Sequence, residues 1–346
     1  MFADCIEAKW IDAFVQAFAL CKVNAGDAVA VLSESQSREL NVQLALLALA
    51  RLGALPFQVI VPTPRQTAPV PVRSTGASQA LHGHGAAIEA LKRASLVVDL
   101  TLEGLLHAPQ LPEILGGGAR VFMISNEHPE ALERLLPDPA HEAVVKAAIK
   151  RCKAARRMHV SSRAGTDLEI VLEGARNAGV WGWCDRPGTV AHWPGGIVVN
   201  FPKANSVNGR LVLDAGDINL TFKRYLERPV ELVIENDYVS DIRGAGTDAE
   251  LMRRYFAAWG DRDAYATSHV GWGLNPGARY EALAMYDRRD TNGTELRAYA
   301  GNFLYSTGAN EFAGRYTQGH FDLPVRGCTI ALDGEAVVRD GALVPG

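Results

Sequence analysis

Residues 319–324 contain a His-x-Asp pair, in which His320 and Asp322 flank Phe321. If this segment is an extended strand, its side chains alternate, and the imidazole and the carboxylate point to the same face. A further histidine, His269, lies upstream. Two imidazoles and one carboxylate are the ligand set of mononuclear non-haem iron(II) oxygenases, which leave coordination positions open for O2 and substrate. A surface turn is the alternative interpretation, because a His-x-Asp pair is common by chance.

The segment around His269 reads Ser268-His269-Val270-Gly271-Trp272-Gly273. Glycine has no Cβ, so it lets another stretch of backbone approach closely, which suits a tight binding site. His107 follows a predicted strand in an apolar stretch, at the kind of position where loops of an α/β domain carry functional groups. A partly buried structural histidine is the alternative for His107.

The composition describes an ordinary globular protein with enough apolar residues for a large core. The chain has 346 residues, of which 48% are hydrophobic and 21% charged, and this length suggests two domains or one large one. The net charge of −4 gives no reason to expect a nucleic acid or an anionic membrane as partner. No apolar run approaches the ~20 residues of a membrane span, and the N-terminus lacks the basic start of a signal peptide.

The five cysteines are scattered, and none has the CxxC spacing of a zinc or redox site. Reduced thiols in the cytoplasm are therefore expected. The glycine run at 116–118 precedes a predicted strand instead of following one, so it does not fit the dinucleotide-binding fingerprint, and there is no phosphate-binding P-loop. The sequence gives no support for a nucleotide cofactor.

The first half of the chain alternates between amphipathic and short apolar segments, which is typical of an α/β domain. In the first predicted helix, Ile6, Trp10, Phe14 and Phe18 are spaced four apart. The predicted helices cover 5–22, 40–52, 86–93 and 139–155, and the predicted strands cover 28–32, 56–61, 96–100 and 121–124. Residues 62–85 are rich in proline and glycine and predict a long loop; whether it is a lid over a site is left open.

From about residue 158 the pattern becomes strand-rich. Strands are predicted at 167–172, 196–200, 209–214, 230–234 and 238–242, with a hairpin turn at Asn236-Asp237 and a helix at 248–259. We therefore predict an α/β N-terminal domain over 1–157 and a strand-rich α+β C-terminal domain over 158–346, which carries the metal-ligating residues.

The segments SHVGWGLNPGARY, STGANEF and GHFDLPVRGCTIALDGEAVVRDG resemble the C-terminal half of the 2,5-dihydroxypyridine 5,6-dioxygenases. This family of bacterial iron(II) enzymes shares its fold with the thermophilic metallo-aminopeptidases of the aminopeptidase T group. The resemblance extends more loosely over nearly the whole chain, including the turn at 165–168. It implies the two-domain architecture of aminopeptidase T.

The two groups differ in their metal ligands. The aminopeptidases hold two metal ions and need two glutamates and an additional histidine. The first glutamate would fall within 194–197, the second at His269 and the additional histidine near Leu304. This chain has no carboxylate at the first two positions and no histidine at the third. Loss of charged oxygen ligands disfavours a second metal ion. The resemblance therefore implies one Fe(2+) ion bound by His269, His320 and Asp322.

The resemblance also implies roles for residues that carry little signal of their own. Ser306 matches a serine at the metal, although a turn-capping serine is an equal alternative because a neutral hydroxyl is a weak ligand. His107 matches the proposed active-site base, which suits an imidazole that titrates near neutrality. His192 and Trp193 are candidate substrate contacts, since they stand beside the position of a peptidase glutamate. Trp181 and Trp183 could wall an aromatic ring, or they could pack in the core.

By this resemblance the chain is expected to be a ring-cleaving dioxygenase. It would open the C5–C6 bond of 2,5-dihydroxypyridine to N-formylmaleamate in nicotinate- or nicotine-type catabolism, with a small aromatic substrate and O2 as its partners. We expect a cytoplasmic homo-oligomer without nucleic acid or membrane partners. Two alternatives stay open: an aminopeptidase-type hydrolase, and a non-catalytic binding subunit of the same fold. The sequence also leaves open which substituted hydroxypyridine is the substrate.

Overall fold

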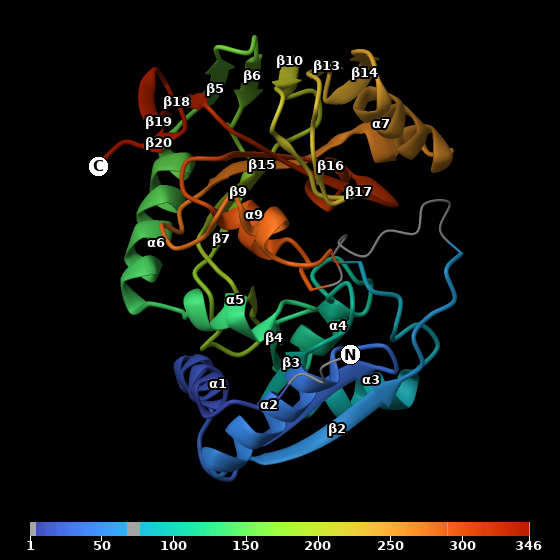
Figure 1. Cartoon of the computed structure of the whole chain (residues 1–346), viewed down its shortest axis with the longest axis vertical. Helices are drawn as coiled ribbons and strands as arrows, with labels where there is room; N and C mark the ends of the chain where they lie inside the picture. Colours follow the sequence, from blue (N-terminus) through green and yellow to red (C-terminus); the bar gives the residue numbers. More distant parts are fainter. Residues whose placement is uncertain (1–4, 68–76, 289, 346) are drawn as a thin grey trace.

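The computed structural model describes residues 5–67, 77–288 and 290–345. Its lower part in Figure 1 is a five-stranded parallel sheet with helices on both faces, and its upper part is rich in strands. The first sheet has the order β2-β1-β3-β4-β8. Its strands are β1 (Ala28–Glu34), β2 (Leu55–Val61), β3 (Leu96–Asp99), β4 (Arg120–Met123) and β8 (Val190–His192).

Helices cover both faces of this sheet because its strands are apolar on both sides. Val29 and Val31 of β1 pack with helices α1 and α2, whereas Ala30 and Leu32 contribute to the opposite face, with α3 and α4. The helices of this half are α1 (Ala8–Leu20), α2 (Glu39–Arg51), α3 (Gly85–Lys92), α4 (Leu111–Gly116) and α5 (Pro129–Arg134). Helix α6 (Pro139–Ala154) packs instead against the core of the strand-rich part.

The four-residue spacing in α1 has the expected effect. Trp10, Phe14 and Phe18 lie on its buried face, as predicted. The sequence spacing also predicted Ile6 on this buried face. The helix begins only at Ala8, however, and Ile6 is 46% exposed. The stripe is therefore one turn shorter than the sequence spacing predicted.

Two large sheets and one two-stranded sheet form the strand-rich part, and one large core cluster fills the space around the large sheets. The eight-stranded sheet has the order β14-β13-β10-β6-β5-β18-β19-β20. Its strands are β5 (Arg157–Ser162), β6 (Asp167–Val171), β10 (Val207–Leu213), β13 (Val230–Glu235), β14 (Tyr238–Arg243), β18 (Cys328–Leu332), β19 (Glu335–Arg339) and β20 (Ala342–Leu343).

The other five-stranded sheet, with the order β17-β16-β15-β9-β7, carries most of the predicted site residues. Its strands are β7 (Arg176–Val180), β9 (Ile197–Phe201), β15 (Thr267–Gly273), β16 (Phe303–Asn310) and β17 (Arg315–Val325). The remaining elements are β11 (Ile218–Asn219), β12 (Arg224–Tyr225), α7 (Thr247–Ala258), α8 (Ala282–Met285), α9 (Thr294–Ala298), η1 (Arg262–Tyr265) and η2 (Glu311–Ala313).

The predicted fold class, an α/β part followed by a strand-rich α+β part, is confirmed. One strand crosses the predicted boundary: β8 follows residue 158 in the chain, yet it completes the first sheet by pairing with β4. The division at 157/158 stays a proposal. The loop predicted at 62–85 includes residues 68–76, which lie outside the described residues. In the part of the chain that the structure describes, no helix combines the length and apolarity needed to cross a bilayer.

Candidate metal centre

Three adjacent strands bring four of the predicted site residues together. In the antiparallel register, His269 of β15 is opposite Ser306 of β16, and Ser306 is opposite Asp322 of β17. His320 lies two residues before Asp322 on the same strand, so both side chains leave the same face of the sheet. The extended conformation predicted for the His-x-Asp segment is confirmed.

The two imidazoles and the carboxylate converge on one point. The Nε2 atom of His320 lies 3.2 Å from Oδ1 of Asp322, and Nε2 of His269 lies 3.7 Å from the same oxygen. The potential ligand atoms of the three residues all lie within 4.8 Å of one another, and all three side chains are buried. Two nitrogens and one oxygen at this spacing fit a single divalent transition-metal ion such as iron(II).

The other carboxylate oxygen of Asp322 is held by a guanidinium. Arg297 of α9 donates its Nε–H to Oδ2 of Asp322, which leaves Oδ1 directed toward the histidines. Burial alone would raise the pKa of Asp322, but the positive charge of Arg297 and the neighbouring His320 hold it well below its usual range. Asp322 is therefore an ionised, oriented carboxylate, as a metal ligand must be.

Ser306 lies between the ligands instead of capping a turn. Its hydroxyl donates a hydrogen bond to Oδ1 of Asp322, and its Oγ lies 3.0 Å from Nε2 of His269. Burial lowers the pKa of His269 to about 4, so at neutral pH its imidazole is uncharged and its lone pair is available to a metal ion. The hydroxyl of Ser306 is thus within reach of any ion that the three residues hold.

His107 approaches this cluster from the other half of the chain. It follows β3, and its ring centroid lies 4.6 Å from that of His320 and 6.4 Å from that of His269. Burial is the largest cause that keeps the pKa of His107 well below its ordinary value, and the nearby His320 and His269 lower it further. At neutral pH the ring is therefore uncharged and able to accept a proton.

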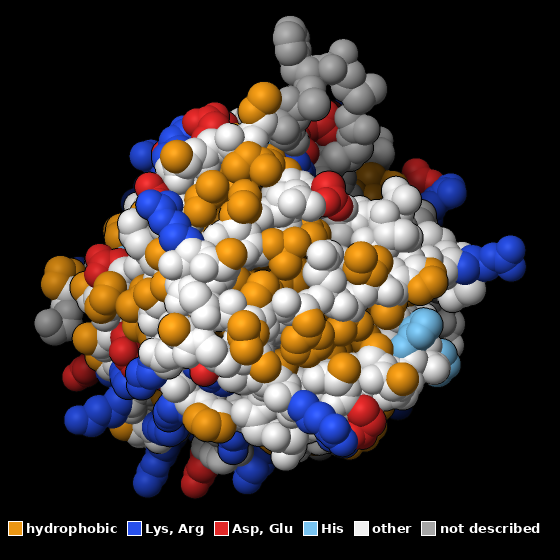
Figure 2. Space-filling view, turned by 90° about the horizontal axis from the view of Figure 1, so that it is seen from below, with side chains coloured by type: hydrophobic (Ala, Val, Ile, Leu, Met, Phe, Trp, Pro, Cys, Tyr) orange, Lys and Arg blue, Asp and Glu red, His pale blue; other side chains and the backbone are white. Residues whose placement is uncertain are grey.

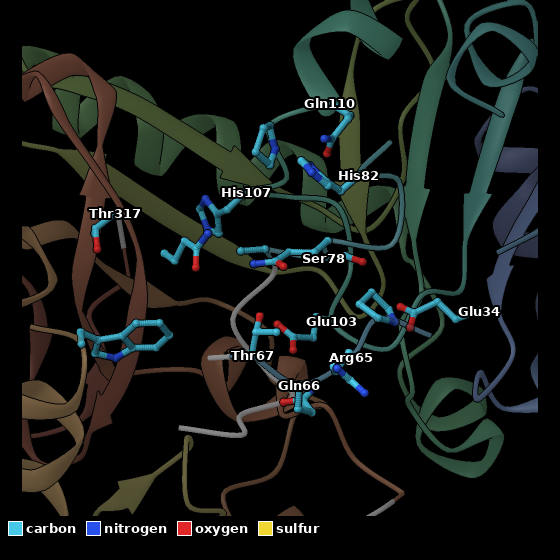
Figure 3. A pocket seen from close by; sticks show the side chains of 16 residues that line it. Glu34, Arg65, Gln66, Thr67, Ser78, His82, Glu103, His107, Gln110 and Thr317 are labelled. Atoms are coloured by element: carbon cyan, nitrogen blue, oxygen red, sulfur yellow. The ribbon is translucent and has the colours of Figure 1, made fainter. Parts of the chain in front are cut away.

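The half-buried His107 also forms part of the wall of a cavity of about 360 Å³. Figure 3 shows Glu103, Gln110 and Thr317 among the other side chains that line it. The cavity is partly polar, and its walls come from both halves of the chain. It provides a space next to His107, whose ring lies against that of His320, into which a small molecule could enter.

His192 and Trp193 are neighbours in sequence but point to different places. His192 is buried at the end of β8, with Nδ1 2.6 Å from the carbonyl oxygen of Pro194. Burial is the main cause that lowers the pKa of His192 to about 4, and the charges of Arg297 and Asp322 are near enough to act on it as well. His192 thus remains a candidate substrate contact.

Trp193 is fully buried in the core of the first sheet, where its ring lies 5.3 Å from Phe14 and 6.3 Å from Phe122. Its indole N–H donates to the carbonyl of Leu135 over 2.6 Å. These contacts favour a packing role for Trp193. Trp183 is buried in the same cluster and Trp181 packs at its edge, so packing accounts for these two tryptophans as well.

Sequence reasoning missed three residues that support the cluster. Arg297 orients Asp322, and Tyr255 of α7 donates its hydroxyl to the carbonyl of His320 over 2.6 Å. Glu127, buried after β4, accepts the backbone N–H of Thr294 at the start of α9. None of the three lies in a recognisable motif, because each acts through a contact between segments far apart in the chain.

The glycine beside His269 has the predicted function of close backbone approach. A Cβ added at Gly271 would lie 1.9 Å from the carbonyl oxygen of Val198 on β9. We expect Gly271→Ala to destabilise the protein by roughly 1–3 kcal/mol, because the neighbouring strand has to move away from β15. Thermal unfolding measures this change. Gly116→Ala is the matched control, since an added Cβ there meets nothing within 4 Å; an equal melting temperature for the two variants would contradict the argument.

The chain matches known proteins over nearly its whole length. A family model described as NicX, 2,5-dihydroxypyridine 5,6-dioxygenase, matches residues 9–345. A relative from Pseudomonas putida (strain KT2440), 2,5-dihydroxypyridine 5,6-dioxygenase, is 38% identical over 341 residues, which are 97% of this chain and 96% of the relative.

Two solved structures share the fold. The structure of 2,5-dihydroxypyridine dioxygenase from Pseudomonas putida KT2440 matches with a TM-score of 0.92 and 37% identity, over 99% of both chains. Wild-type AmpT from Thermus thermophilus matches with a TM-score of 0.64 over 97% of this chain and 99% of that chain. At 17% identity the second likeness concerns the fold alone.

Proposed function

This chain belongs to the 2,5-dihydroxypyridine 5,6-dioxygenase family, and we propose that it opens the C5–C6 bond of 2,5-dihydroxypyridine, or of a close hydroxypyridine, with O2. The product would be N-formylmaleamate. The observation that carries the proposal is the buried group of His269, His320 and Asp322 beside a cavity that His107 lines. The enzyme is a dioxygenase with a small aromatic substrate, and the aromatic ring would supply all four electrons that O2 accepts.

The proposed metal is one iron(II) ion, held by His269, His320 and Asp322 with Ser306 in reach. An iron(II) ion held by these residues would supply coordination positions for substrate and O2, so that the two could react with each other. The donor set supports this choice, since two imidazoles and one carboxylate are typical of non-haem iron oxygenases. Arg297 supports it too, because it fixes one oxygen of Asp322 and leaves the other for the ion.

The residues around the metal have separate tasks in this proposal. His107 takes the proton of a substrate hydroxyl, which raises the electron density of the ring; its uncharged imidazole has a free nitrogen lone pair for this step. His192 contacts the substrate from the end of β8. Tyr255 and Arg297 keep His320 and Asp322 in place while the substrate enters from the cavity.

The glycines at 195 and 196 argue against the alternative of a two-metal aminopeptidase. A side chain at Gly195 would place its Cβ 2.2 Å from the backbone nitrogen of Gly182, and one at Gly196 would meet Asn275 at 2.6 Å. A glutamate ligand therefore has no room in this segment. Among the described residues, His269, His320 and Asp322 are the one group of His, Cys, Asp and Glu side chains whose spacing suits a metal ion.

The proposal is tested by anaerobic purification, iron analysis and O2 uptake with a small panel of hydroxypyridines. We expect one iron per chain and stoichiometric O2 consumption with 2,5-dihydroxypyridine. Two zinc or cobalt ions per chain together with peptide hydrolysis would favour the aminopeptidase-type alternative. Protein that binds no metal under these conditions would favour the non-catalytic subunit. We further propose that the reaction belongs to nicotinate-type catabolism and takes place in the cytoplasm. A reducing compartment is supported by the buried free thiols of Cys21, Cys152, Cys184 and Cys328.

Ser306→Ala is expected to retain iron but to turn over more slowly or with a changed pH dependence. The hydroxyl is a weak ligand, and its loss removes one hydrogen bond from Oδ1 of Asp322 without removing a charge. Iron content and the pH profile of turnover measure the two effects separately. Complete loss of iron would make Ser306 an essential ligand, and unchanged kinetics would leave it a structural role only.

A further inference from the structure

Strand β15 contains an irregularity at Ser268, directly before the predicted ligand His269. Thr267 pairs with Thr307 and His269 pairs with Ser306, so two steps along β15 correspond to one step along β16. Ser268 is the extra residue of this β-bulge. In a regular strand, neighbouring side chains point to opposite faces of the sheet. A bulge interrupts this alternation and can redirect a side chain, which is why bulges are frequent beside functional sites.

The bulge brings the hydroxyl of Ser268 to the ring of its own neighbour. Oγ of Ser268 lies 3.2 Å from Nδ1 of His269 and 2.5 Å from the carbonyl oxygen of Ala309. These residues belong to the upper, strand-rich part in Figure 1, so they lie behind the face that Figure 2 shows from below. Ser268 is fully buried and His269 is nearly so. Bulk water therefore competes little for either contact.

The two partners of Ser268 determine where its hydroxyl proton points. A serine hydroxyl has one hydrogen to donate and lone pairs with which to accept. A carbonyl oxygen can only accept, so the hydroxyl of Ser268 donates to Ala309. Ser268 then presents a lone pair to Nδ1 of His269, and a hydrogen bond forms there only if Nδ1 carries the proton of the neutral imidazole. The other ring nitrogen, Nε2, is left with its lone pair.

A second serine offers a competing acceptor on the other side of the ring. Oγ of Ser306 lies 3.0 Å from Nε2 of His269, and the hydroxyl of Ser306 donates to Oδ1 of Asp322. Ser306 therefore presents a lone pair to Nε2, which by itself would favour a proton on that nitrogen. Nε2 is also the nitrogen that lies 3.7 Å from Oδ1 of Asp322. A proton on Nε2 would block the lone pair that a metal ion needs.

We propose that Ser268 is a positioning residue that holds the proton of His269 on Nδ1 and thereby keeps Nε2 free for the metal ion. The inference rests on the proposed metal site and adds a residue outside its ligands. An outer partner of this kind fixes the tautomer and the orientation of a ligating histidine. The bulge then has a purpose, because regular pairing would direct Ser268 to the face opposite His269.

The position of the ring proton in the metal-free protein tests the proposal directly. With isotope-labelled histidine, long-range proton–nitrogen correlation spectra distinguish a protonated from an unprotonated ring nitrogen, and His269→Gln identifies the signals of His269 by their loss. At neutral pH we expect the proton on Nδ1 in the wild type. In Ser268→Ala we expect it on Nε2, because Ser306 is then the remaining acceptor. A wild-type proton on Nε2, or the same tautomer in both proteins, would overturn the proposal.

The affinity for zinc(II), measured by competition with a chromophoric chelator, tests the consequence. Ser268→Ala should bind zinc ~10–100 times more weakly, as is typical when an outer partner of a ligating histidine is removed. Thr166→Val is the matched control, since the buried hydroxyl of Thr166 donates to the carbonyl of Val212 in the eight-stranded sheet.

The control loses a comparable hydrogen bond without touching His269, so its zinc affinity should stay at the wild-type value. Unchanged zinc affinity in Ser268→Ala, or an equal loss in Thr166→Val, would contradict the role of Ser268. A wild type that binds no metal ion would instead reject the proposed metal site, and the ring-proton spectra would still decide whether Ser268 sets the tautomer of His269.

Discussion

His320→Ala and Asp322→Ala are expected to lose stoichiometric iron and all measurable ring cleavage while the protein stays folded. Each change removes one of three ligands, and the two that remain cannot hold iron(II) against water. The fold should survive because these residues lie on neighbouring strands that are held by a backbone hydrogen-bond ladder and a large apolar core. Iron analysis, O2 uptake and circular dichroism measure the three expectations.

The two variants should differ in stability. Asp322→Ala leaves the buried guanidinium of Arg297 without this carboxylate, and breaking a buried ion pair typically costs about 3–5 kcal/mol. His320→Ala leaves no charge behind, so its melting temperature should be closer to the wild type. His159→Ala is the matched control, because His159 is an exposed histidine paired with Asp167 on a different sheet. Full iron content in His320→Ala would refute the ligand set.

His107→Ala is expected to keep its iron and to bind substrate, but to turn over ~10²–10⁴ times more slowly, as is typical when a general base is removed. The ring of His107 contacts His320 without being one of the three clustered ligands, so its loss should leave the metal in place. Iron analysis and single-turnover kinetics under O2 separate metal loss from slow chemistry.

The deficit of His107→Ala should shrink as the pH rises. At high pH a growing fraction of the substrate hydroxyl is already deprotonated in solution, so the base contributes less. The ratio of wild-type to variant rates across pH measures this directly. A variant as fast as the wild type at neutral pH would exclude His107 as the base, and His192 would become the next residue to test.

Part of the cluster of His269, His320 and Asp322 could be predicted from the sequence because its signal is local. A histidine and an aspartate two residues apart face the same side of any strand, so His320 and Asp322 needed only the prediction that their segment is extended. His269 was assigned through the family resemblance, and Gly271 in its segment does lie against a neighbouring strand, as the glycines predicted. The alternation of helices and strands likewise predicted the first sheet, since its strands are short and apolar.

The support of the site could not be predicted because its contacts are long-range. Arg297 belongs to a helix of only five residues, which has too little sequence to show a helical period. Trp193 shows the opposite difficulty: it directly follows His192, the last residue of β8, but its ring packs in the core against Phe14. The position of Trp193 next to a candidate site residue in the sequence therefore gave no information about the direction of the tryptophan side chain.

Strand β8 has a consequence for the order in which the protein folds during synthesis. It pairs with β4, but the ribosome makes β5, β6 and β7 before it reaches Val190. Until then β4, with Val121 and Phe122, is an apolar edge without its last neighbour. A nascent chain therefore cannot complete its N-terminal sheet when the first half has emerged, and the long sequence separation of this pairing should slow folding. Translation and folding of the two halves are thus interleaved.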